Sequence, residues 1–341
     1  MPILNHASGS ANPATSLSAL WAYLHPALDH IIKAPATDPN GKAPALDFGL
    51  YAGIHSACYN YFTAQGEAHA IPLARPPPDT RSGPDIYDQL DKYFAEAARE
   101  LSLAAPIDDI ALVQYLVPSF NRYNAGAQSA NRLLNYVNRH YVKRAVDEDR
   151  GWFRLTDVIE TVAKNTSFED SREAISRVLR EKKLEELKKW GYPDDGSLEQ
   201  AAFAESCAEA ASPPDRVVPI ASLAHRRFRT EVMEPLLATP KIKGNSKAKH
   251  KIPKASPGPN PTRPKGRLAR AVKELLETDA VDEEERLRLA AGLAKMLQVV
   301  GIRSDHLLRK RLDKYVASAP SPPPATTPDA GAPISSSIVV S

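Results

Sequence analysis

Cysteine is scarce in this chain, which contains only Cys58 and Cys207. Two cysteines are too few for the disulfide framework of a small secreted domain or for a structural zinc site. The N-terminus has neither a basic start nor an apolar stretch, so we predict no secretory signal. These features predict a protein of the reducing cell interior, in the cytoplasm, the nucleus or both. Cys58 lies in an apolar segment without a basic neighbour, which favours a buried, inert thiol over a nucleophile.

Long apolar runs and the common catalytic motifs are also missing. No window of about 18 apolar residues occurs, so we expect no membrane-spanning helix. The phosphate-binding loop, the dinucleotide-binding glycine motif and the nucleophile elbow have no match. The nine histidines are scattered, and no two have the i, i+4 spacing of a helical metal site. We therefore predict that the chain is not an enzyme and holds no metal or cofactor.

Apolar residues recur at helical spacing through most of the chain, and no segment has a convincing strand pattern. This periodicity predicts an all-α protein. Ser16 is a candidate N-cap for the first helix, because its hydroxyl can accept from a free backbone N–H. The expected helices cover 17–33, 47–65, 85–101, 109–123, 127–146, 151–163, 169–190, 199–211, 225–237, 267–278, 283–300 and 304–316.

Proline and charge divide the chain into segments. The stretch from Lys241 to Arg270 holds ten basic residues and no acidic one, which predicts a linker. The residues after Ala317 are too poor in large apolar side chains to pack. The predicted division is a disordered 1–16, a first domain of five helices over 17–163, a charged and Ala-rich helical insertion over 164–238, a basic Pro-rich linker over 239–266, C-terminal helices over 267–316 and a disordered tail over 317–341.

The segment 47–65 is unusual because no charged residue occurs between Asp47 and Glu67. One stripe at helical spacing comprises Leu50, Ile54, Ala57 and Tyr61. A neighbouring stripe comprises Tyr51, His55, Cys58 or Tyr59, and Phe62. A helix that is apolar on two faces must be covered on both. We assign the first stripe to the core, and the second is either core, as aromatic stripes usually are, or a surface for a partner.

Five places in the chain resemble cullins. The run LYAGIHSACYNYFT over Leu50–Thr63 resembles their second helix, most of all in the fungal cullins that use F-box-carrying adaptors. The other places agree in order and spacing: LWAYL at 20–24, IYDQL at 86–90, the stretch 115–123, and LNYVNRHYVKR at 134–144. The resemblance covers Leu17–Val162. Around Phe228 and from Arg270 onward, the pattern looks like the helices that follow in cullins.

The resemblance implies a site. In cullins the N-terminal part is a stalk of five-helix repeats, and the tip of the first repeat binds an adaptor through its second and fifth helices. The implied adaptor-binding residues here are Tyr51, His55, Tyr59, Phe62, Leu133, Tyr136 and Arg139, with His140 as an alternative to Arg139. The second helix agrees, because Tyr and Phe are favoured at the desolvated centre of protein interfaces. No winged-helix region or modification-site lysine follows, so no RING-box protein is expected to bind this chain.

The implied function is that of a scaffold subunit in a ubiquitin ligase complex, within ubiquitin-dependent protein catabolism. The expected partner is an F-box-carrying adaptor. BTB-type and elongin-type adaptors are alternatives, because related cullins present the same surface to them. Two further hypotheses stay open: a shortened cullin that competes with a full-length one for the adaptor, and a degenerate copy without function.

The basic stretch carries a separate alternative. A candidate nuclear-localisation signal comprises Lys247, Lys249, Lys251 and Lys254. The same stretch would serve a nucleic-acid-associated helical protein. It has no aromatic residues for base stacking, so nucleic acid is not an expected partner. A solvated loop without a task is the third interpretation.

Overall fold

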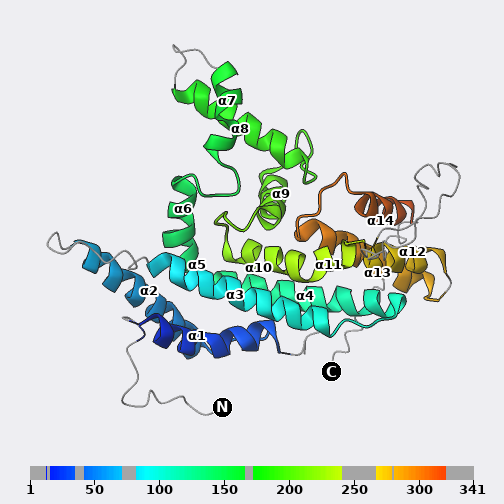
Figure 1. Ribbon diagram of the computed structural model, residues 1–341, viewed down its shortest axis with the longest axis horizontal. Coiled ribbons are helices and arrows are strands. Elements are labelled where there is room, and N and C mark those ends of the chain that lie inside the picture. Colours follow the sequence, from blue (N-terminus) through cyan, green and yellow to red (C-terminus); the bar gives the residue numbers. More distant parts are fainter. Residues whose placement is uncertain are drawn as a thin grey trace, which may run out of the picture.

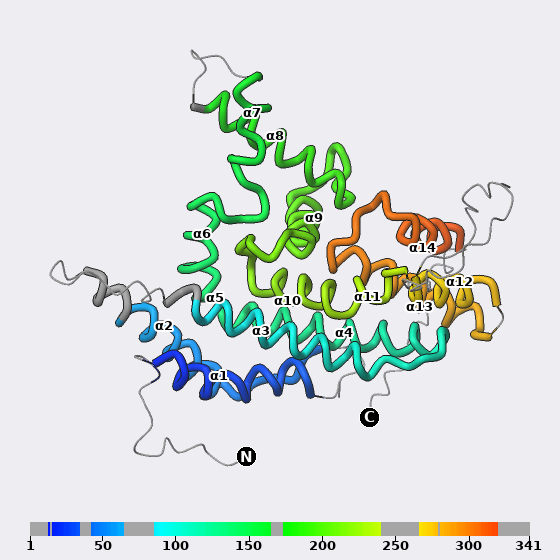
Figure 2. Tube along the Cα trace, in the orientation of Figure 1, coloured from blue at the N-terminus to red at the C-terminus, as the bar shows by residue number. Residues whose placement is uncertain are grey.

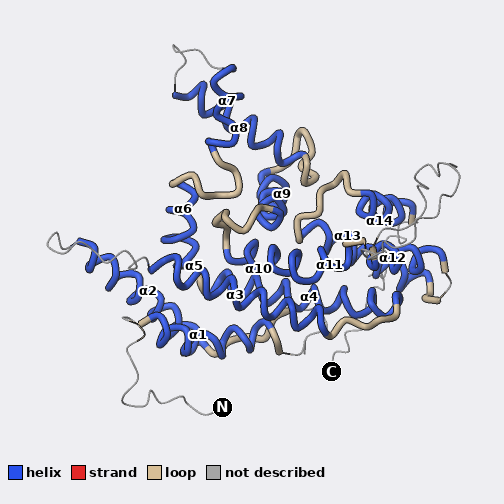
Figure 3. The backbone as a smooth tube through the Cα atoms, viewed as in Figure 1, coloured by secondary structure: helices blue, strands red, loops and turns tan. Residues whose placement is uncertain are grey.

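The computed structural model describes Pro13 and residues 16–34, 42–70, 82–165, 172–239, 266–278 and 280–319, and Figure 2 draws the other residues in grey. The described ranges contain helices, turns and loops but no strand, which confirms the all-α prediction (Figure 3). None of their helices is both long and apolar enough to cross a membrane. The four lysines of the candidate nuclear signal, and most of the predicted disordered ends, lie outside these residues.

Four helices form the centre of the molecule (Figure 1). They are α1 (Leu17–Ile32), α3 (Ser82–Leu103), α4 (Asp109–Leu133) and α10 (Ile220–Phe228). Both α1 and α10 pack against α3 and against α4, and in Figure 1 α1 lies below these two long helices while α10 lies above them. The predicted N-cap is confirmed, since Ser16 Oγ accepts from the backbone N–H of Ala19 at 3.4 Å.

The remaining helices cover this centre. On one side α2 (Phe48–Ala70) packs against α1, and its contacts extend to the short helix α5 (Asn135–Val137). On α4 lie α12 (Arg267–Glu277) and α13 (Glu283–Val299), and α14 (Leu307–Ser318) packs on α13. Helix α9 (Leu198–Ala211) packs on α10, and from it α8 (Arg172–Lys188) and α7 (Leu155–Asn165) project away from the bundle (Figure 1).

One continuous apolar core joins segments that are far apart in the sequence, from Leu20 in α1 to Leu312 in α14. Phe228 of α10 lies at its centre, with ring centroids 5.0 Å from Phe120 and 5.3 Å from Tyr123, both in α4. The segment 217–237 therefore contributes to the same core as the first helices, although its sequence pattern suggested part of an insertion. The domain division itself stays a prediction.

Buried polar contacts fix α10 between its neighbours. The Tyr87 hydroxyl donates to the Val218 carbonyl and accepts from the Val218 N–H, both at 2.9 Å. The Tyr123 hydroxyl contacts the carbonyls of Phe94 at 3.3 Å and Ala224 at 3.1 Å. These hydroxyls satisfy backbone groups that would be costly to bury unpaired.

The predicted break near residue 125 is wrong, because α4 runs without interruption to Leu133. Gly126 is buried inside this helix, where the end of α1 packs against it. A Cβ there would lie 2.5 Å from the Ile31 carbonyl oxygen. The glycine therefore marks close helix packing, and the chain breaks at Leu134 instead.

A candidate protein-binding surface on α2 and α5

The two faces of α2 differ as its two stripes predict, with Tyr59 rather than Cys58 in the exposed stripe. Ile54, Cys58 and Tyr61 are buried in the core. Burial raises the pKa of the Cys58 thiol to about 12, as expected for an inert cysteine. The helix begins where the Asp47 carboxylate accepts from the N–H groups of Gly49 at 2.9 Å and Leu50 at 3.3 Å, which caps the first turn. Tyr51, His55 and Tyr59 lie on the exposed face.

Next to the exposed face of α2 lies a segment made of three short helical pieces, of which α5 is the first. After α5 comes a π-helical segment, η1 (Asn138–Val142), followed by α6 (Lys143–Asp147). In η1 the N–H of Lys143 reaches the carbonyl of Asn138, five residues back. Such wide turns are frequent at functional sites.

Two asparagines hold η1 in place. The Asn138 Nδ2 donates to Asn131 Oδ1 at 2.9 Å. The side-chain oxygens of the same pair accept from the N–H groups of Ile220 at 3.1 Å and Ala221 at 3.3 Å. Pro219, the N-cap of α10, offers no side-chain acceptor, so these two asparagines cap α10 from another part of the chain. The π-helical segment is thereby tied to the central bundle.

Tyr136 is the centre of an aromatic cluster between α2 and η1. Its ring centroid lies 5.6 Å from that of Tyr59, 5.5 Å from Phe62 and 6.3 Å from His55. The contacts with Tyr59 and His55 are edge-to-face, which is a favoured geometry for ring pairs. On its other side the ring stacks on His140. Tyr59 remains 49% exposed, so the cluster faces solvent rather than the core.

The other implied site residues have different environments. The Tyr51 hydroxyl donates to the Arg132 carbonyl at 3.3 Å, which bridges α2 to the end of α4. Arg139 is exposed beside the cluster. Leu133 is only 1% exposed and belongs to the core, so it supports the surface from beneath. The structure thus brings together His55, Tyr59, Phe62 and Tyr136, with Tyr51 and Arg139 at the edge.

Two residues of this surface were not in the main set of adaptor-binding residues implied by the sequence, Phe48 and His140. Phe48, at the start of α2, is 82% exposed and precedes Tyr51 by three residues, so it extends the same stripe by one turn. Its spacing was the signal that could have identified it. His140, which the resemblance gives as an alternative to Arg139, has its imidazole in the ring cluster.

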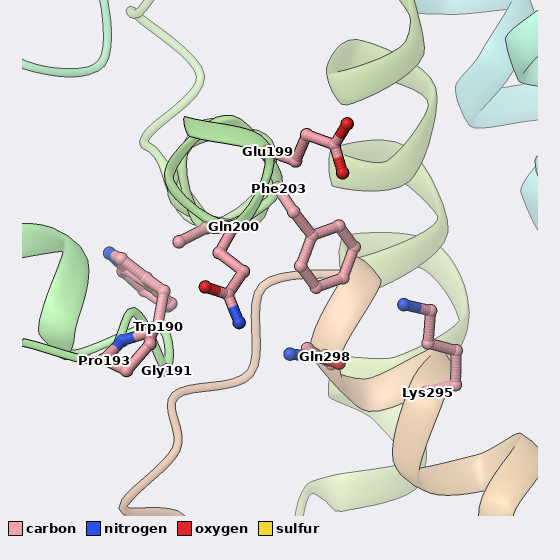
Figure 4. A pocket seen from close by; sticks show the side chains of 9 residues that line it. Trp190, Gly191, Pro193, Glu199, Gln200, Phe203, Lys295 and Gln298 are labelled. Atoms are coloured by element: carbon pink, nitrogen blue, oxygen red, sulfur yellow. The ribbon is translucent and has the colours of Figure 1, made fainter. Parts of the chain in front are cut away.

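A separate pocket of about 380 Å³ is lined by residues from three segments (Figure 4). These segments are helix α9, helix α13 and the turn that follows α8. Trp190, Phe203 and Gln298 are among its lining residues, and Lys295 Nζ lies 3.9 Å from the centre of the Phe203 ring. No Ser, Thr, Cys or His lines it. Across the described ranges, no group of three or more His, Cys, Asp or Glu side chains is arranged to hold a metal ion.

The fold and the ring cluster together define an all-helical protein with an exposed aromatic surface of the kind found in protein interfaces. Comparison with curated proteins gives two relatives. The chain is 23% identical over 170 residues to Cell division control protein 53 of Saccharomyces cerevisiae, covering 48% of this chain and 20% of that protein. It is 22% identical over 139 residues to Cullin-1 of Dictyostelium discoideum, covering 40% of this chain and 18% of that protein.

These similarities support a cullin-like relation. They span about a fifth of the length of each relative. No protein-family model matches the chain, and no solved structure matches it.

Proposed function

We propose that this chain is a non-catalytic, cullin-like scaffold in a ubiquitin ligase assembly. Its surface on α2, α5 and η1 binds an adaptor protein of the F-box-carrying type. The observation that carries the proposal is the exposed ring cluster around Tyr136. It lies on the two segments, 50–63 and 134–144, whose sequences resemble the adaptor-binding helices of cullins.

The physical character of the surface supports a protein partner. Tyr and other aromatic side chains contribute most to binding when they enter a desolvated pocket of the partner. Here the rings of Tyr59, Phe62 and Tyr136 restrict one another before any partner arrives, so little side-chain entropy is lost on binding. The exposed face of α2 also carries no Lys, Arg, Asp or Glu that would resist desolvation from residue 48 to 65.

The test is a calorimetric titration of the full chain against purified F-box-carrying, BTB-type and elongin-type adaptors. We expect binding to the F-box-carrying adaptor. The double substitution His55→Ala/Tyr59→Ala should abolish this binding while thermal unfolding changes little, because both side chains are exposed.

A matched control is Ile107→Ala. Ile107 is 90% exposed in the turn before α4, at the opposite end of that helix from α5. Its removal should leave adaptor binding unchanged. A folded chain that binds none of the three adaptors would overturn the proposal. Binding only to a BTB-type or elongin-type adaptor would retain the scaffold and change its partner.

A further inference from the structure

The ring cluster is bordered by positive charge. From Ala111 to Val146 the sequence contains no Asp or Glu. Its basic residues are Arg122, Arg132, Arg139, Lys143 and Arg144. The facing helix α2 is uncharged from Phe48 to Gln65. The chain as a whole is nearly balanced, with 44 Lys and Arg against 41 Asp and Glu, so this local excess is not a result of overall composition.

The basic side chains beside the rings differ in their pairing. Arg144 lies 3.6 Å from the Glu148 carboxylate, which also pairs with Arg150 at 2.9 Å. Arg132 donates to the neutral Ser129 hydroxyl and forms no salt bridge within the described ranges. Arg139 and Lys143 are exposed and form no salt bridge with any residue that the structure describes. Other exposed cations, such as Lys188 and Arg288, do have a carboxylate neighbour.

Arg139 and Lys143 are adjacent to the rings. Arg139 follows Tyr136 by three residues and Lys143 follows His140 by three, which places each within one helical turn of the cluster. Asp147 lies one turn beyond Lys143 without pairing with it in the described structure. The surface therefore presents rings at its centre and unneutralised positive charge on the η1 side.

We infer that the partner presents an apolar pocket for these rings and, beside it, a cluster of acidic side chains that faces Arg139 and Lys143. This inference rests on the proposed function, because it describes the protein that the same surface binds. Rim charges of opposite sign raise the rate of association and select among partners more than they add affinity. The arrangement would favour adaptors with an acidic border over others with a similar apolar pocket.

Rings beside positive charge are also a feature of single-strand nucleic-acid binding, in which bases stack on exposed ring faces. The geometry favours a protein. The Tyr136 ring has one face stacked on His140, and the edges of Tyr59 and His55 pack against the same ring. Little free ring face is left at the centre of the cluster for a base.

The test measures association kinetics of the full chain with the F-box-carrying adaptor at low and high ionic strength. The variant is Arg139→Glu/Lys143→Glu. Its matched control is Lys310→Glu/Lys314→Glu on α14, which has the same spacing and charge change on two exposed residues of a helix away from α2 (Figure 1). We expect the variant to associate about tenfold more slowly at low salt, with its dissociation rate little changed. The difference should shrink at high salt, where charges are screened beyond a few ångströms.

Each other outcome has a definite meaning. Equal association rates for the two charge-reversal variants at low salt would overturn the acidic border and leave the proposed function intact. Absence of adaptor binding by the unaltered chain would overturn both. A labelled single-stranded oligonucleotide is the second probe. Binding of this probe that is lost in both Arg139→Glu/Lys143→Glu and His55→Ala/Tyr59→Ala would replace the protein partner with nucleic acid.

Discussion

The imidazole of His140 stacks on the ring of Tyr136, with centroids 4.0 Å apart and planes inclined by 24°. Tyr136 lies in α5 and His140 follows it by four residues in η1, so this stack holds the Tyr136 ring beside the rings of α2. We expect Tyr136→Ala to weaken adaptor binding by about 2 kcal/mol, or roughly 30-fold in Kd. Titration calorimetry measures it, with Tyr136→Phe as the control that keeps the ring. Equal Kd values for the two variants would show that the ring does not contribute.

Gly126 gives a prediction about the fold. Replacing glycine by alanine inside a helix ordinarily stabilises a protein by about 1 kcal/mol. Here the new methyl group would meet the Ile31 carbonyl oxygen and the Ile32 side chain, so Gly126→Ala should destabilise by about 2 kcal/mol. Urea denaturation measures the change, with Gln128→Ala on the exposed side of α4 as the control. A stabilised Gly126→Ala protein would mean that α1 and α4 are less closely packed than described.

The asparagine pair that caps α10 gives a prediction about coupling. Asn138→Ala should lower the free energy of unfolding by about 1 to 2 kcal/mol, because it leaves the Ile220 N–H without its acceptor. Asn131→Ala should cost a similar amount, and the double variant should cost less than the sum, since the two side chains also bond each other. Denaturant unfolding of the four proteins in the cycle measures this, with exposed Asn121→Ala as the control. If the effects of the two single substitutions on the free energy of unfolding simply add in the double variant, the two asparagines do not act together as a cap of α10.

Glu209 gives a prediction about pH. Burial raises the pKa of its carboxyl to about 7, although the Ser222 hydroxyl donates to it at 2.6 Å. The unfolded chain loses this proton at the ordinary value of 4.5. Between these two values the folded state holds the extra proton, so stability falls as the pH rises toward 7 and then levels off.

The matching variant is Glu209→Gln, which cannot ionise. Between about pH 5 and about pH 8 its stability should rise relative to the unaltered chain by on the order of 2 kcal/mol. Thermal and denaturant unfolding at the two pH values measure this. Glu199→Gln, the same change in the first turn of α9, is the control and should show no such trend. A pH dependence of unfolding that is identical with and without Glu209 would contradict a buried, protonated carboxyl.

Local signals made much of the fold predictable. Ser16 and the apolar spacing after it located α1, and the two stripes of 47–65 correctly separated Ile54 and Tyr61 from Tyr51 and Tyr59. The faces of an uninterrupted helix follow directly from a period of 3.6 residues.

The second half of the site was less predictable for a physical reason. The chain breaks at Leu134 and continues through a π-helical turn, so the faces of 127–146 do not follow one regular period. Leu133, which only the resemblance implied as an adaptor-binding residue, is buried at the end of α4, just before this break. Packing of α10 between α3 and α4 was beyond reach as well, since contacts across more than a hundred residues, such as that of Tyr87 with Val218, leave no local pattern.

The wide turn at Asn138–Val142 also determines how far α6 is rotated about the helix axis relative to α5. Each residue of an α-helix advances the chain by about 100° around its axis. Because η1 spans five residues between its bonded groups instead of four, everything after it is rotated relative to a regular helix. Deleting one residue from η1 would turn α6 by about that angle and carry Lys143 away from the side on which Tyr136 lies. The one additional residue in this turn thus determines whether the Tyr136 ring and the Lys143 charge face the same partner.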